Sequence, residues 1–269
     1  MQNDTPRRFA ITEDTVDLMQ SDSKAHSKKI GLVVGAHPDD ADFGAGGTVA
    51  LWSQEDWEFH YLILTNGAKG TSDREMSRDP LIPIREQEQK ACSEVLGVHS
   101  CTFLGGEDGE LDYTREMLGN VVREIRRLKP YAIFTHSPEI VLRRKTEEQV
   151  NDGVAEFEGF VNHRDHRNTG AMTIDAIYPT ARDHLNFPEH ITDEGLSTHE
   201  VREIYIWGAN VPNFSVDISS VVDTKVEALL RHDSQFGHRR DMFLDRVRGR
   251  WIDSDGHFYE RFDRVILPF

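Results

Sequence analysis

Two short stretches of this sequence concentrate histidine and aspartate at spacings that could bind a metal ion. The first reads HPDDAD and begins at His37. Pro38 fixes its own φ and disfavours helical geometry in the residue before it, so the chain makes a defined turn here. An imidazole and a carboxylate three residues apart on that turn, His37 and Asp40, can converge on one cation. Asp39, which lies between them, then points elsewhere around the ion.

The second stretch, NHRDHR, offers His163, Asp165 and His166. If a helix begins here, the two histidines lie on its first turn and face the same side. One ligand from this segment would complete a set of imidazoles and a carboxylate, and three protein ligands leave a position for water, as in catalytic zinc sites. Zinc lowers the pKa of a bound water from about 15.7 to about 7, and a neighbouring carboxylate can then take its proton.

Each stretch on its own also has a simpler interpretation. An aspartate after a strand commonly caps a helix, and histidine and aspartate in a first helical turn can satisfy the helix end. The metal-site interpretation requires both stretches to lie at the same edge of one sheet, where ligands and base line one cleft. It therefore depends on the elements that carry them.

Apolar runs of strand length alternate with helical periodicity from about residue 30 onward. Strands are predicted at 29–36, 58–65, 101–104 and 131–136, with helices at 43–54, 84–98 and 113–129 between them. This alternation predicts right-handed βαβ crossovers and an α/β fold of three-layer, Rossmann-like layout, with a mostly parallel sheet flanked by helices. A polar cluster follows each of these four strands, which is where open α/β sheets bind ligands.

The pattern is weaker beyond the fourth strand. Residues 138–162 are charged and weakly periodic, so we expect a long loop over the strand ends, with a short surface helix as the alternative. The later elements expected are a helix at 164–178, strands at 203–208 and 214–218, a helix at 219–232 and a terminal hairpin around SDG. We expect a polar N-terminal arm over residues 1–29 and one domain over residues 30–269.

Composition limits the classes of partner. The chain has 47 acidic and 31 basic residues, a formal charge of -16, whereas nucleic acids and anionic membranes attract clustered Lys and Arg. No segment has the apolar run of a signal peptide or of a membrane span. We therefore expect a cytoplasmic protein with neither nucleic acid nor a membrane as partner. Cys92 and Cys101 form no CxxC pair and are expected to be small core residues.

Seven ordered blocks of the sequence resemble the LmbE-like, or PIG-L, family of zinc-dependent N-acetylglucosaminyl deacetylases. They run from about residue 30 to residue 236 and read AHPDDADFGAGGT, TNGAKG, REQEQKACSEVLGV, FLGGEDGEL, FTHSPE, NHRDHRNTG and KVEALLRHDSQF. The resemblance implies a zinc ion, with another divalent ion such as iron(II) as the alternative, bound by His37, Asp40 and His166. It also implies that Asp39 is the general base.

The same resemblance implies roles for the other polar residues. His163 would stabilise the oxyanion or protonate the leaving amine, and Asp165 would orient His163 and favour its protonated form. Arg85 and Asp108 match family positions that contact the sugar. Many members have a glutamate directly after the two aspartates, whereas this chain has its acid one residue later, at Asp42, which we expect to support a metal ligand from behind.

The resemblance implies that the protein removes the N-acetyl group from a GlcNAc-type amino sugar or glycoconjugate, and it leaves a homo-oligomer open. One alternative is an amidase that acts on a larger thiol-conjugate or antibiotic amide. A second is a noncatalytic, metal-dependent carbohydrate-binding protein, which would need neither Asp39 nor His163. A third is a dinucleotide-binding oxidoreductase, disfavoured because the glycines of GAGG follow HPDD instead of opening the turn as GxGxxG.

Overall fold

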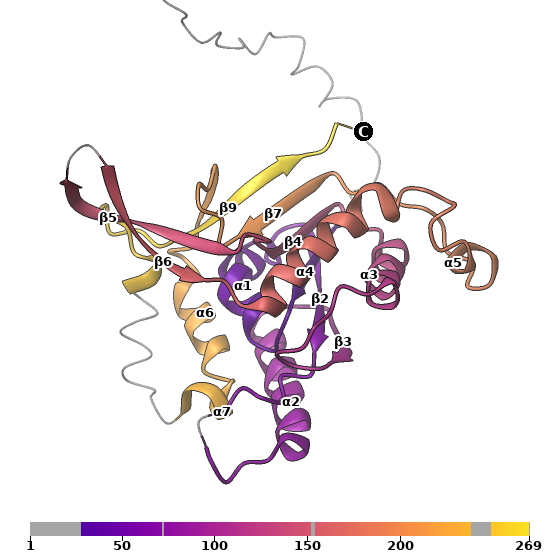
Figure 1. The fold of residues 1–269 in the computed structure, drawn as a ribbon, viewed down its shortest axis with the longest axis horizontal. Helices are drawn as coiled ribbons and strands as arrows, with labels where there is room; N and C mark the ends of the chain where they lie inside the picture. Colours follow the sequence, from indigo (N-terminus) through magenta and orange to yellow (C-terminus); the bar gives the residue numbers. More distant parts are fainter. Residues whose placement is uncertain (1–27, 72, 152–153, 238–248, 269) are drawn as a thin grey trace, which may run out of the picture.

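The computed structural model describes residues 28–71, 73–151, 154–237 and 249–268, and the expected N-terminal arm lies almost wholly outside these ranges. Its centre is a seven-stranded sheet with the order β3-β2-β1-β4-β7-β9-β8 (Figure 1). The strands of this sheet are β1 (Lys29–Gly35), β2 (Trp57–Thr65), β3 (Ser100–Gly106), β4 (Ala132–His136), β7 (Glu203–Trp207), β8 (Phe214–Asp217) and β9 (Tyr259–Ile266). The main helices are α1 (Asp40–Trp52), α2 (Arg78–Leu96), α3 (Arg115–Leu128), α4 (Arg164–Asp175) and α6 (Val222–Leu229).

The first five strands of the sheet order pair in parallel, and β9 pairs antiparallel with both β7 and β8. Successive residues of β1 face opposite cores: Val33 packs with α1 and α2, whereas Leu32 and Val34 pack with α3 and α4. Both faces are buried, which explains why β1 is a continuous apolar run instead of an alternating one. The predicted three-layer α/β fold is confirmed.

The expectation of a loop or short helix over residues 138–162 is wrong. This segment forms β5 (Val141–Asn151) and β6 (Val154–Val161), an antiparallel pair that projects from the body of the molecule (Figure 1). We call this pair the arm. Among the described residues its strands pair with each other and with no strand of the main sheet, and Phe160 and Val161 at its base are exposed. The charged, weakly periodic sequence of this segment did not predict strands.

Asn162 closes the base of the arm. Its side-chain amide donates to the carbonyls of Ser137 at 2.9 Å and Glu139 at 3.0 Å, and its backbone N–H donates to that of Ile140 at 2.8 Å. The chain therefore returns to the edge of the sheet at the point where it left it, directly before α4.

A buried ion pair fastens α1 to the far end of the chain. Glu260 accepts hydrogen bonds from the backbone N–H groups of Gly47 and Thr48, each at 2.7 Å. The ammonium of Lys225 contacts the same carboxylate and lies 3.7 Å from the ring centre of Trp251. Neither charged side chain of this pair is more than 1% exposed.

The SDG turn closes with a single bridge between Ile252 and Phe258, and the strand that follows it is β9 of the main sheet. In the part of the chain that the structure describes, no helix is both long and apolar enough to cross a membrane.

Candidate active site

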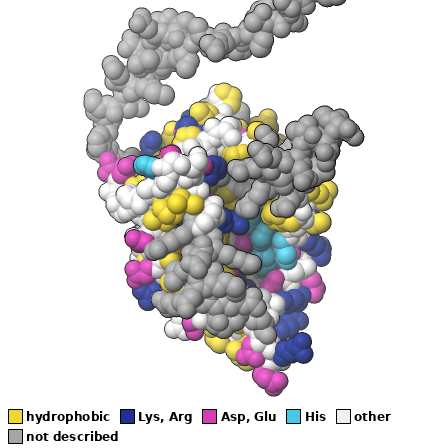
Figure 2. Space-filling model, turned by 90° about the vertical axis from the view of Figure 1, so that its left-hand side faces the viewer, with side chains coloured by type: hydrophobic (Ala, Val, Ile, Leu, Met, Phe, Trp, Pro, Cys, Tyr) yellow, Lys and Arg dark blue, Asp and Glu magenta, His cyan; other side chains and the backbone are white. Residues whose placement is uncertain are grey.

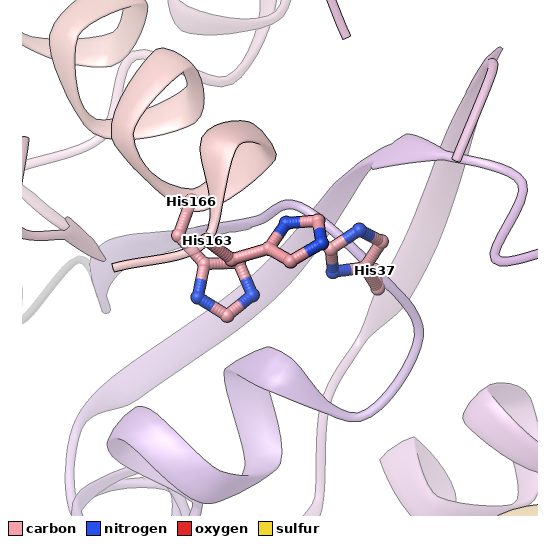
Figure 3. A group of neighbouring side chains, drawn as sticks. All are labelled: His37, His163 and His166. Carbon is pink, nitrogen blue, oxygen red and sulfur yellow. The ribbon is translucent and has the colours of Figure 1, made fainter. Parts of the chain in front are cut away.

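The metal-site residues meet at the carboxyl ends of β1 and β4. These two strands are neighbours, and the chain leaves β1 toward β2 on one side while β4 lies on the other, which opens a crevice at this point. His37 follows β1, and His163 precedes the first turn of α4. Figure 3 shows His37, His163 and His166 gathered there, and Figure 2 shows a patch of histidine side chains at the surface.

The carboxylate of Asp40 is the centre of the cluster. Its oxygens lie 3.1 Å from Nδ1 of His37, 3.2 Å from Nε2 of His166 and 3.4 Å from Nε2 of His136. Burial raises the pKa of Asp40, but His166 and His136 outweigh burial and hold the pKa well below its ordinary value. The three residues predicted as metal ligands are thus brought together around an ionised carboxylate.

The other side of the His37 ring faces two further carboxylates. Its Nε2 lies 3.0 Å from Asp165 and 3.1 Å from Asp108, and because carboxylates only accept, Nε2 is a donor here, while Nδ1 faces Asp40. Burial lowers the pKa of His37, but hydrogen bonds to Asp108, Asp165 and Asp40 outweigh burial and raise the pKa well above its ordinary value.

Two overlapping groups of donors here could hold a divalent cation, and they share His166. The surroundings favour positive charge beside Nδ1 of His37, and two imidazoles with one carboxylate are ligands that suit zinc or iron. The carboxylates behind the His37 ring orient it, as such partners do in metalloenzymes. The donor atoms of His37, His163 and His166 lie within 4.8 Å of one another, as do those of Asp40, His136 and His166.

Asp39 lies beside the cluster in an uncommon backbone conformation. Its φ of 102° and ψ of -28° are in the left-handed region, which costs an L residue about 1–3 kcal/mol. The backbone N–H of Asp39 donates to Oε1 of Gln89 at 2.7 Å, and its carboxylate lies 3.1 Å from Arg85. Burial raises the pKa of Asp39 to about 6, although Arg85 lowers it. A carboxylate whose pKa lies near neutrality is suited to accept a proton.

Arg85 and Asp108, which we expected to contact a sugar, both bind protein groups. Arg85 is 3% exposed and donates to the carbonyls of Pro38 and Gly67 as well as to Asp39. Asp108 accepts from the backbone N–H of Lys69 at 2.8 Å in addition to its contact with His37. Contact with a sugar stays a prediction for both.

The interpretation of Asp165 changes. We expected its carboxylate to orient His163, but it accepts from the N–H groups of Gly109 at 2.6 Å and Leu111 at 3.2 Å and contacts His37. In the first turn of α4 the side chain is fully buried against residues 109–111, and only its backbone N–H donates to Nδ1 of His163, at 3.2 Å. Burial, followed by His37 and His166, lowers the pKa of His163, so this ring is not held in its protonated form.

His136 is a member of the cluster that the sequence analysis did not single out. Its ring stacks on that of His166 at 4.2 Å between centroids, and its Nδ1 accepts from the indole N–H of Trp207 at 3.1 Å. Burial lowers the pKa of His136 to about 4, so the ring is neutral. Its position at the end of a predicted strand, in FTHSPE, was the signal that could have identified it.

Asp42 and His232 lie behind Asp39. Nε2 of His232 lies 2.9 Å from Asp42 Oδ2, and Gln89 donates to the same oxygen at 2.9 Å. Both Asp42 and His232 are fully buried. Among the described contacts, the side chain of Asp42 therefore supports Gln89 and not one of the three predicted metal ligands.

Comparison with known proteins agrees with this geometry. The PIG-L family model, described as GlcNAc-PI de-N-acetylase, matches residues 32–177, more than half of the chain. The chain belongs to the PIG-L family. The resemblance recognised from the seven sequence blocks is thereby confirmed.

Two relatives and one solved structure place this PIG-L protein among its neighbours. Diacetylchitobiose deacetylase of Thermococcus kodakarensis is 31% identical over 87% of this chain and 80% of its own length. Probable N-acetyl-alpha-D-glucosaminyl L-malate deacetylase 2 of Bacillus anthracis is 26% identical, over 88% and 95% of the two chains. The structure of N,N'-diacetylchitobiose deacetylase from Pyrococcus horikoshii matches with a TM-score of 0.74 and 24% identity, over 96% of this chain and 94% of that one. That structure supports the fold.

Proposed function

We propose that this PIG-L protein is a metal-dependent N-deacetylase that hydrolyses the N-acetyl group of a GlcNAc-type amino sugar or glycoconjugate. The observation that carries the proposal is the meeting of His37 and His166 on the carboxylate of Asp40, directly beside Asp39. The two relatives are named for deacetylation of diacetylchitobiose and of an N-acetylglucosaminyl malate, and these names support a GlcNAc-type substrate.

The metal that we propose is zinc, with iron(II) as the alternative, held by His37, Asp40 and His166. When bound, such an ion polarises a carbonyl group and lowers the pKa of a coordinated water. With an ion bound, Asp165 and Asp108 would hold the remaining proton of His37 at Nε2, and Nδ1 would offer its lone pair to the ion.

Asp39 is then the proton acceptor for the attacking water. Its pKa of about 6 leaves it ionised at neutral pH, and Arg85 keeps its carboxylate in place. Proton transfer by a positioned group of this kind contributes roughly 100- to 10,000-fold to a rate.

His163 lies on the open side of the cluster. Its ring centroid is 4.9 Å from that of His37 and 5.1 Å from that of His166. Because Nδ1 accepts the N–H of Asp165, the neutral ring carries its proton on Nε2. That N–H can donate a hydrogen bond to the negative charge that develops on the acetyl oxygen.

Elemental analysis together with a free-amine assay tests this function. We expect about one zinc or iron per chain and amine release from N-acetylglucosamine or N,N'-diacetylchitobiose that stops when a chelator is added. Asp39→Asn should keep the metal and lose roughly 100- to 10,000-fold in turnover, because it removes the base and spares the ligands. Asp79→Asn, an exposed aspartate in α2, is the matched control and should behave as wild type. Amine release that withstands complete removal of the metal would contradict the proposal.

A further inference from the structure

Gln89 is a fully buried side chain of α2 that joins two polar groups beside the active site. Its Oε1 accepts the backbone N–H of Asp39 at 2.7 Å, and its Nε2 donates to Oδ2 of Asp42 at 2.9 Å. A backbone N–H can only donate, so the amide oxygen of Gln89 must face Asp39, and its NH₂ group then donates to Asp42. The orientation of Gln89 is therefore determined by what it bonds.

The support for Gln89 continues behind Asp42. His232, which is also fully buried, contacts Asp42 Oδ2 at 2.9 Å. It directly precedes α7 (Asp233–Phe236), where Ser234 donates its backbone N–H to Glu88 of α2 at 2.8 Å. A buried line of contacts thus runs from His232 through Asp42 and Gln89 to the backbone of Asp39.

We propose that Gln89 is a positioning residue that holds Asp39 in its left-handed backbone conformation, and that Asp42 and His232 hold Gln89 in turn. The inference rests on the proposed function, in which Asp39 is the proton acceptor. Arg85 contacts the carboxylate of Asp39 at 3.1 Å, while Gln89 bonds its backbone. Two contacts on opposite parts of one residue determine where its carboxylate stands relative to the metal ligands.

A purely space-filling role does not account for this arrangement. Burying an amide costs free energy unless both of its ends are hydrogen-bonded, and an apolar side chain would fill the same space without that cost. Gln89 is 0% exposed, and both ends of its amide are hydrogen-bonded, one to the backbone of Asp39 and one to Asp42. Neither hydrogen bond of Gln89 involves His37, Asp40 or His166. Replacing Gln89 should therefore lower turnover and leave metal binding unchanged.

The first test is Gln89→Met, which keeps the length of the side chain and removes both hydrogen bonds. We expect kcat for N,N'-diacetylchitobiose to fall roughly 10- to 100-fold, the range that is typical when a hydrogen-bond partner in a metal site is lost. KM and metal content should stay at wild-type values. Gln87→Met on the exposed side of the same helix is the matched control and should leave kcat unchanged. Thermal unfolding of both variants is the control that checks whether each is folded at the assay temperature.

The second test reads the hydrogen bond without using activity. Pro38–Asp39 is the only Pro–Asp pair in the sequence, so labelling with ¹³C-proline and ¹⁵N-aspartate gives one carbonyl–amide cross-peak in an NMR spectrum. We expect the amide proton of Asp39 to move upfield in Gln89→Met, because its 2.7 Å hydrogen bond is lost, and to stay in place in Gln87→Met. A resonance that does not move in Gln89→Met would overturn the inference.

A double-mutant cycle separates this inference from the proposed function. If Gln89 acts through Asp39, Gln89→Met should reduce kcat little further in an Asp39→Asn background. Wild-type kcat in Gln89→Met, or losses that multiply in the double variant, would overturn the role of Gln89 and leave the proposed function intact. Wild-type kcat in Asp39→Asn would instead overturn the assignment of Asp39 and, with it, the inference.

Discussion

Replacing Glu260 by glutamine should destabilise the protein more than most single changes. The carboxylate of Glu260 is 1% exposed, accepts two backbone N–H groups of α1 and is the charge partner of the fully buried Lys225. Glutamine has nearly the same shape but carries no charge. The ammonium of Lys225 would then be buried without the negative charge of residue 260.

The magnitude follows from these contacts. Removing one partner of a buried ion pair typically costs about 3–5 kcal/mol. The single amide oxygen of glutamine can also serve only part of the set formed by Gly47 N–H, Thr48 N–H and Lys225. We therefore expect a loss of about 3–5 kcal/mol or somewhat more in the free energy of unfolding, a large share of the roughly 5–15 kcal/mol that stabilises a typical protein.

Urea unfolding followed by tryptophan fluorescence measures this loss. The control is Glu227→Gln, an exposed glutamate paired with Arg231 on the same α6 that carries Lys225, which should change the free energy of unfolding by at most about 1 kcal/mol. Adding Lys225→Met to Glu260→Gln should recover part of the loss, because the unpaired charge is then gone. A loss below about 1 kcal/mol in Glu260→Gln would refute the reasoning.

Three further predictions concern the metal. His166→Ala should lower the metal content of the purified protein, because it removes one of three ligands, and full occupancy by elemental analysis would contradict the assignment. Asp165→Asn should weaken metal affinity roughly 10- to 100-fold in competition with a chelating dye, because the carboxylate behind the His37 ring is lost; unchanged affinity would contradict that role. An ion present at ~100 times its Kd adds ~2.7 kcal/mol to the free energy of unfolding, so removing it should lower the melting temperature by about 5–10 °C. An unchanged melting temperature would contradict binding of the metal to the folded state.

Local sequence features and the family resemblance together indicated the residues that meet around Asp40. His37 and Asp40 lie on one turn directly after a predicted strand, where open α/β sheets bind ligands. His166 was assigned through the family resemblance, because the segment before it was expected to be a loop. The layers of the fold were predictable because each strand and helix shows its own apolar periodicity, without reference to distant parts of the chain.

Contacts that depend on how distant elements pack could not be predicted in this way. His136 reaches Asp40 because β4 lies beside β1, and Gln89 reaches Asp39 because α2 packs near α1. Asp165 was assigned to its sequence neighbour His163, but the start of α4 points its side chain toward a loop more than fifty residues earlier. The arm was missed because its sequence is charged and weakly periodic, and strands are predicted from apolar periodicity.

The hydrogen bonds of Asn162 hold the two ends of the arm together at the edge of the sheet. Because the chain leaves and re-enters the sheet edge at one point, the arm can lengthen, shorten or be exchanged without moving His163 or α4. The arm is thus a replaceable module beside the chemistry.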